Sequence, residues 1–169
     1  MARKVTSAVG VNLTAGAPLA AGSTTVYIPE YALGERVVAD SGIYQYLQAN
    51  GAVAEGYACK FVEGTFDADA VTTAESASAN TPLGVCVTSG GLADNQYGWF
   101  WRGDGQDYVY LTTTISIDTQ LTTGAGTAGQ VTTGGDPIHD LFNTVASTTA
   151  GLYLCRSATL LNTNSTITN

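Results

Sequence analysis

Residues 121–135 read LTTGAGTAGQVTTGG and contain a glycine pattern that could do chemistry. Gly124, Gly126 and Gly129 match the G-x-G-x-x-G spacing of loops that bind the pyrophosphate of a dinucleotide. Such a loop follows a buried parallel strand and opens a helix, whose free N–H groups hold the phosphate. Here the glycines precede Val, Thr and a Gly-Gly-Asp-Pro run, which disfavour a helix, and the carboxylate expected about 20 residues further on is missing. We therefore interpret the segment as a glycine-rich turn and predict no nucleotide cofactor.

The other side chains that could do chemistry are few and scattered. His139 is the single histidine, and no serine or cysteine lies beside it in sequence, so a catalytic base is not indicated. Asp67 and Asp69 would share one face of an extended segment, but a calcium site needs further oxygen ligands. Residues 102–104 spell the Arg-Gly-Asp tripeptide of adhesion ligands, although Gly-Asp is also common at turns. We predict a protein that is not an enzyme and that binds no metal, cofactor or small-molecule substrate.

The three cysteines, Cys59, Cys86 and Cys155, each lie among apolar neighbours. An odd count, the absence of a C-x-x-C pair and a single histidine argue against a disulfide framework or a zinc site. We expect buried, reduced thiols within strands, which fits folding in a reducing cytoplasm.

Composition limits the classes of partner. The chain of 169 residues is long enough for one domain with its own core. Its formal net charge is −8 and its six basic residues form no cluster, which argues against nucleic-acid binding. Only 12% of the residues are charged, against about 25% in typical soluble domains, so we expect protein partners to cover much of the surface. The first residues lack the apolar run of a signal peptide, and no stretch is long enough to span a membrane.

Short apolar and aromatic segments separated by turn residues predict strands rather than helices. We expect strands over residues 25–31, 42–49, 57–64, 83–91, 96–105, 107–114 and 151–161. We expect a polar loop over 65–81 and a hairpin turn at 103–105, and residues 138–147 fit either a strand or a helix. Many short strands at regular spacing predict an all-β fold, a small antiparallel β-barrel or sandwich.

The two ends of the chain differ in composition from this β domain, which we place at residues 25–161. Residues 1–24 are mainly Ala, Gly, Ser and Thr without a helical period, and predict an extended N-terminal arm. Residues 162–169 form a polar tail. Because the arm has too little apolar content to fold alone, we expect it to lie along a neighbouring subunit and to add backbone hydrogen bonds. Its candidate contact residues are Arg3, Lys4, Val5, Val9, Val11 and Leu13.

A stripe of aromatic residues supplies the other candidate interface. In a strand, Tyr97, Trp99 and Trp101 fall on one face. Three rings of this size exceed what the interior of a small barrel can hold. For Trp99 we favour the core, and for Trp101 a contact with another copy or a partner, although each could take either place.

Four segments, in this order and spacing, resemble a known family. They read GIYQYLQANGAVAEGYACKF, PLGVCVTSGGLADNQYGWFWRGDG, LTTGAGTAGQVTT and TTAGLYLC. They resemble the small capsid decoration (cement) proteins of tailed bacteriophages, over roughly residues 42–156. The strand elements of the family match residues 52–56, 84–85, 97–99 and 150–152. Trp101 and the first 41 residues depart from the family pattern.

The resemblance implies a structural protein that binds the outer surface of an assembled phage capsid and bridges neighbouring subunits of the major capsid protein. It implies a homotrimer without nucleic-acid or membrane partners, made in the host bacterial cytoplasm and located in the virion. Bridging contacts would stabilise the shell against the outward pressure of packaged DNA. The alternative is a phage tail or fibre module, or an adhesin-type module, that binds a receptor or a glycan through the aromatic stripe.

Overall fold

The computed structural model describes residues 11–62, 64–71, 81–123, 126–134, 137–157 and 161–162. Within these ranges the regular elements are all strands, which confirms the predicted all-β class. The same ranges contain no helix with the length and apolar character needed to cross a membrane.

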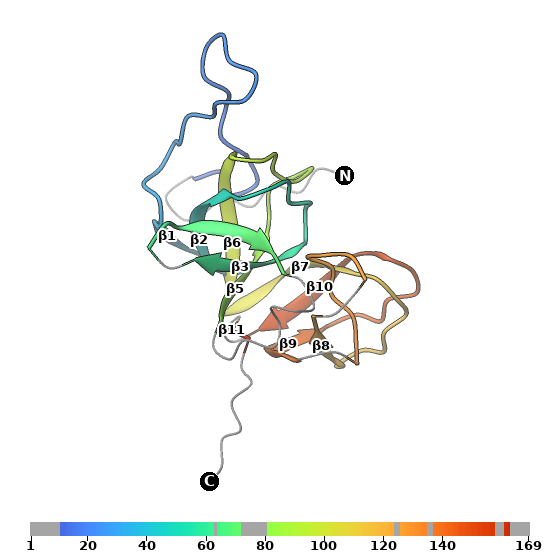
Figure 1. The fold of residues 1–169 in the computed structure, drawn as a ribbon. Coiled ribbons are helices and arrows are strands. Elements are labelled where there is room, and N and C mark those ends of the chain that lie inside the picture. Colours follow the sequence, from blue (N-terminus) through green and yellow to red (C-terminus); the bar gives the residue numbers. More distant parts are fainter. Residues whose placement is uncertain are drawn as a thin grey trace.

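Five strands close into a small barrel (Figure 1). They are β2 (Gly42–Ala49), β3 (Ala58–Val62), β4 (Asp67–Ala70), β5 (Thr81–Cys86) and β6 (Tyr97–Gly103). Their order around the barrel is β2-β4-β3-β5-β6, and β6 pairs back onto β2. The β2–β4 pair is parallel and the other pairs are antiparallel, so the barrel is mixed rather than wholly antiparallel as predicted. Strand β1 (Arg36–Ala39) forms a hairpin with the first half of β2.

A second, antiparallel sheet lies beside the barrel (Figure 1). It contains β7 (Gly105–Leu111), β8 (Gln120–Thr122), β9 (Pro137–Asn143) and β10 (Gly151–Ser157), in the order β7-β10-β9-β8. The short strand β11 (Leu161–Asn162) pairs with β5 of the barrel and with β9 of the sheet. Backbone hydrogen bonds therefore connect the two parts.

The barrel wall is apolar on both faces. An inner cluster with members from all five barrel strands fills the interior, and it includes Leu47, Phe61, Ala68, Cys86 and Phe100. Because side chains alternate along a strand, their neighbours face outward. This outer cluster includes Tyr44, Tyr46, Val85, Trp99 and Trp101, and it continues into Val109, Leu111, Leu121, Leu141 and Cys155 of the second sheet. The second sheet thus covers the outer wall formed by β2, β5 and β6.

The aromatic stripe of β6 is buried within the single chain. Trp99 lies in the core, with its ring centroid 5.1 Å from that of Tyr46 and 5.2 Å from that of Tyr31. Trp101 is also 0% exposed, so the expected contact with another copy or partner is wrong for this ring. The rings do exceed the barrel interior, but they lie on its outer wall under other parts of the same chain. Gly42, with a φ of 134°, leaves room for the ring of Trp101, because a Cβ at this position would lie 2.5 Å from the indole nitrogen.

The segment before the barrel also belongs to the core. Leu13 and Ala17 are buried, Val11 packs against the outer cluster, and the N–H of Ala17 donates to the carbonyl of Tyr97 over 2.8 Å. The expectation that residues 1–24 extend along a neighbouring subunit is therefore wrong for residues 11–17, since their few apolar side chains cover the barrel wall of the same chain. Arg3, Lys4, Val5 and Val9 lie outside the described residues.

Other differences from the predicted strands have local causes. Strand β4 occupies the predicted polar loop, because Asp67 and Asp69 alternate with the buried Ala68. Residues 25–31 form only an isolated bridge between Tyr27 and Leu19. The ambiguous segment 138–147 begins as strand β9, and β1 and β8 were not predicted.

The turn predicted at residues 103–105 is present, but it does not close a hairpin. All three residues have positive φ, with Asp104 at 58°. These angles lead the chain out of the barrel into the second sheet, where β7 pairs with β10 along its whole length.

Replacing Trp101 tests its assignment to the core. Trp101→Ala should lower the free energy of unfolding by roughly 3–5 kcal/mol, because a large buried ring is lost. Trp101→Phe should cost clearly less, since it keeps a ring and, among the described residues, the buried indole N–H of Trp101 has no hydrogen-bond partner to lose. Urea unfolding of the two variants measures both effects. Near-native stability of Trp101→Ala would contradict the buried position.

Candidate functional site

The glycine loop lies between β8 and β9 of the second sheet and contacts the barrel through Gly129. Gly124 and part of the loop lie outside the described residues, but the chain after Gly129 is extended and Val131 bridges to Leu111. Gly129 has a φ of 82° and lies against the ring of Tyr57, where a Cβ would approach to 2.5 Å. Its carbonyl accepts from the N–H of Ala58 and its N–H donates to Val71, over 2.7 and 2.8 Å. These contacts give the glycine a structural role, as the turn prediction requires.

The cysteine thiols are placed where they are unreactive. Cys59, Cys86 and Cys155 are all buried and free. Burial raises the pKa of Cys86 and of Cys155 to about 12 and that of Cys59 well above its ordinary value. Since the thiolate is the nucleophile, none of these thiols is activated at neutral pH.

Among the described side chains, the remaining polar candidates do not lie together in one cluster. Asp69 pairs with Lys60 at 3.8 Å on the outer face of the barrel. His139 belongs to β9, and its side chain lies outside the described residues. Across the described ranges, no three His, Cys, Asp or Glu side chains are close enough together to hold a metal ion.

The described residues include two exposed apolar surfaces, and the first is a narrow ribbon over residues 18–28. Its two sides are joined by hydrogen bonds from Ala20 N to Val26 O and from Ile28 N to Pro18 O, over 2.7 and 2.9 Å. The hydroxyl of Ser23 accepts from two N–H groups at the tip. In Figure 1 the ribbon, in blue, projects from the barrel away from the second sheet.

The ribbon exposes apolar side chains without a core of its own. Leu19, Val26 and Ile28 are 44%, 58% and 51% exposed. A lone two-stranded ribbon is marginally stable in water. Exposed apolar groups on a projecting ribbon are typical of a segment that is covered when a partner binds.

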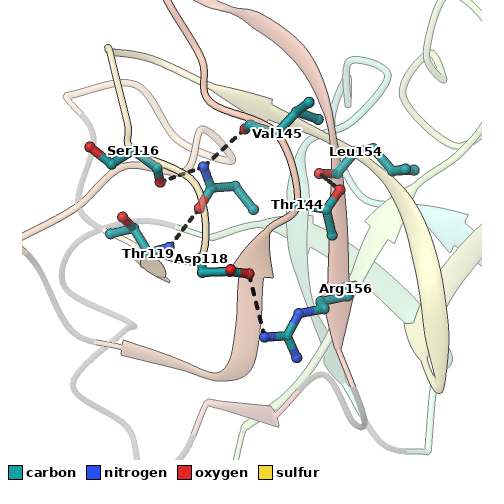
Figure 2. A network of polar contacts seen from close by, with 8 residues as sticks. Ser116, Asp118, Thr119, Thr144, Val145, Leu154 and Arg156 are labelled. Atoms are coloured by element: carbon teal, nitrogen blue, oxygen red, sulfur yellow. Dashed lines mark hydrogen bonds and ion pairs between the residues drawn. The ribbon is translucent and has the colours of Figure 1, made fainter.

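The second surface consists of two loops held by one buried amide. The side chain of Asn143, fully buried, donates to the carbonyls of Ser116 and Val145 over 2.7 and 3.0 Å and accepts from the N–H of Thr119 over 2.9 Å. Figure 2 shows Ser116 and Thr119 on one side of this network and Val145 on the other.

Figure 2 shows two further contacts that hold the same loops in place. The hydroxyl of Thr144 donates to the carbonyl of Leu154, and Arg156 approaches Asp118 at 3.6 Å. We name residues 116–119 and 144–146 the loop pair. It presents Ile117 and Val145 to solvent, and its backbone is pre-organised because polar contacts already fix it.

The structure thus places the described residues that were predicted to form an interface in the core or against it. Leu13, Trp99 and Trp101 are core residues, and Val11 and Tyr97 are partly buried against the same cluster. The ribbon falls mostly inside the predicted arm, whereas the loop pair was not predicted. No sequence signal identified the loop pair, because its surface depends on Asn143 contacting both loops.

No family model and no curated protein matches the chain. Among solved structures, the chain is similar to the base of the head fibre protein gp8.5 of bacteriophage phi29, with a TM-score of 0.45 and 13% identity over 70% of this chain and 96% of that chain. This degree of similarity does not establish a common fold. Membership of the decoration-protein family stays a prediction.

The buried thiols predict a pH dependence of stability. Unfolded thiols ionise near pH 9 and the folded Cys86 only near 12, so the contribution of this thiol is complete below pH 9 and is lost as the pH rises towards 12. At about pH 10 the loss should be about 1.4 kcal/mol per thiol.

Urea unfolding of the wild type and of Cys86→Ala at about pH 8 and about pH 10 measures this loss. The variant should lose less stability between the two pH values, and the comparison cancels the shared titration of the tyrosines. An identical loss in both proteins would contradict burial of the Cys86 thiol.

Proposed function

We propose that this protein is a structural component of a bacteriophage head, which binds the outer surface of the capsid without doing chemistry. The observation that carries the proposal is the ribbon over residues 18–28, whose apolar side chains project from a stably packed body. The sequence resemblance to capsid decoration proteins supplies the partner, the major capsid protein. The similarity to a phage head fibre base agrees with this, but it is too low to add support.

A binding protein of this kind needs a rigid body and surfaces free for contact. The two core clusters give the body, while the charged fraction of 12% leaves a surface that repels partners weakly. The ribbon supplies apolar side chains, and its edges carry backbone groups that could pair with a strand of the capsid subunit.

We further propose that the protein bridges two capsid subunits, because it has two separate apolar surfaces. The ribbon extends from the barrel, and the loop pair lies on the second sheet. On an assembled shell the second contact forms at high effective concentration, so two weak contacts together can raise affinity by about 10²–10⁴. Soluble capsid subunits would lack this gain.

Changing the ribbon tests attachment. The triple variant Leu19→Ser, Val26→Ser, Ile28→Ser should remain folded, because these side chains are exposed, and should lose at least about tenfold in affinity for assembled shells. Co-sedimentation with shells of the cognate capsid protein measures the affinity. The matched control is Val38→Ser with Leu152→Ser, which removes apolar side chains that are exposed elsewhere. Equal losses in both variants, or none in the ribbon variant, would contradict the proposed contact.

Changing the loop pair tests bridging separately. Ile117→Ser with Val145→Ser should weaken binding to shells by about 10² or more but leave the weak binding to soluble capsid subunits unchanged, if those subunits contact only the ribbon. The heat stability of shells decorated with this variant should fall towards that of bare shells. Normal binding and normal shell stability would refute bridging through these loops while leaving attachment through the ribbon intact.

A further inference from the structure

A pocket of about 270 Å³ opens at one end of the barrel. This is slightly below the ~300–1,000 Å³ of typical sites for drug-sized ligands, so it suits a group the size of a side chain. Its described lining combines apolar residues, among them Phe61, Val62, Gly64 and Phe66, with the polar side chains of Arg36, Arg102 and Gln45.

Arg102 is held in a fixed orientation beside this pocket. It follows Phe100 by two positions on β6, so it shares the inner face of the barrel. Its guanidinium carbon lies 4.4 Å from the ring centroid of Phe61, and its Nη1 donates to Oε1 of Gln45 over 3.1 Å. Gln45 is buried and in turn donates to the carbonyl of Gly34. The Arg-Gly-Asp tripeptide is therefore not displayed as one exposed loop.

Arg36 adds a second guanidinium from the neighbouring strand. Arg36 is the cross-strand partner of Gln45 in the β1–β2 hairpin, so both side chains lie on the same face. Arg36 is exposed, and in the described part of the chain no ion pair involves it. The described lining includes no acidic side chain.

The charge distribution makes this arrangement unusual for the chain. The net charge is −8, and only Arg36, Lys60, Arg102 and Arg156 are basic among the described residues. Lys60 and Arg156 each pair with an aspartate on the surface. Arg36 and Arg102 both line the pocket, and because Arg102 is engaged in contacts within the chain, the exposed Arg36 supplies the positive charge for an anion.

The rim of the pocket shows a further constraint. Phe66 has a φ of 59°, which is rare for a bulky residue and costs energy. Its ring lies against Gly34, where a Cβ would come within 2.5 Å. The surroundings thus hold an aromatic ring at the mouth of the pocket.

We propose that this pocket binds a carboxylate carried on a small apolar body. A guanidinium fork matches the two oxygens of a carboxylate, and the aromatic and aliphatic walls would accept the body. The carboxylate could belong to a free small molecule or to an acidic residue of a polypeptide, and the chemistry is the same. The site lies apart from the ribbon and the loop pair and does not depend on the proposed function.

Titration of the full chain with phenylacetate, followed by calorimetry and by NMR shifts, tests the site. Arg36→Gln should weaken binding about tenfold or more, since a charged hydrogen bond is lost. Arg156→Gln, an exposed arginine outside the pocket, is the matched control and should bind as the wild type does. Phenylacetamide, which lacks the charge, should bind at least about tenfold more weakly than phenylacetate.

Three outcomes would overturn the proposal: no binding of phenylacetate, equal binding by wild type and Arg36→Gln, or inorganic phosphate binding as tightly as phenylacetate. Glu63 is adjacent in sequence to Val62 and Gly64 and lies outside the described residues. Binding of phenylacetate only to Glu63→Gln would show that the pocket serves an ion pair of the chain itself, which also overturns the proposal.

A capped tripeptide with a central glutamate between two leucines separates the two sources. Tighter binding of the tripeptide than of phenylacetate assigns the site to an acidic residue of a polypeptide. Binding of phenylacetate alone assigns it to a free small carboxylate. Either result supports the carboxylate site.

Discussion

The burial of the outer barrel wall is the interaction on which the rest of this structure depends. A five-stranded barrel has room inside for one layer of modest side chains, and Phe61, Phe100 and the residues around them fill it. Tyr44, Tyr46, Trp99 and Trp101 must then be covered from outside. The second sheet and residues 11–17 supply this cover, so the barrel and the sheet form one cooperative body. A buried hydrogen bond also connects the barrel to the second sheet, since the hydroxyl of Tyr44 donates to the carboxylate of Asp107 over 2.6 Å.

The sequence predicted the fold where local pattern decides it. Strand β2 was predicted at its observed bounds, because its aromatic and β-branched residues lie between turn residues. Strand β4 was missed, because its short sequence of Asp and Ala carries a weak β signal. Pairing between distant segments, such as β2 with β4 and β7 with β10, has no local signature. The position of Trp101 followed from that pairing, so its ring was wrongly expected at an interface.

The functional surfaces were predictable only in part. The low charge and the weakly apolar N-terminal segment indicated a contact arm, and the ribbon lies largely in that region. The loop pair and the pocket depend on residues far apart in sequence, as when Gln45 meets Arg102 across two barrel strands. A rigid body with two separate apolar surfaces is suited to a role in which many copies each add a modest contact to a larger assembly. In such a role the strength of binding comes from the number and arrangement of the contacts rather than from any single site.

Electron cryo-microscopy of capsid shells incubated with this protein tests the central claim most directly. The account predicts density for the barrel and second sheet on the outside of the shell, with residues 18–28 against one capsid subunit and the loop pair against its neighbour. It also predicts many copies at equivalent lattice positions, because every such position offers the same pair of contacts. Density confined to the tail or to a single vertex, or a ribbon that points into solvent on a decorated shell, would contradict it.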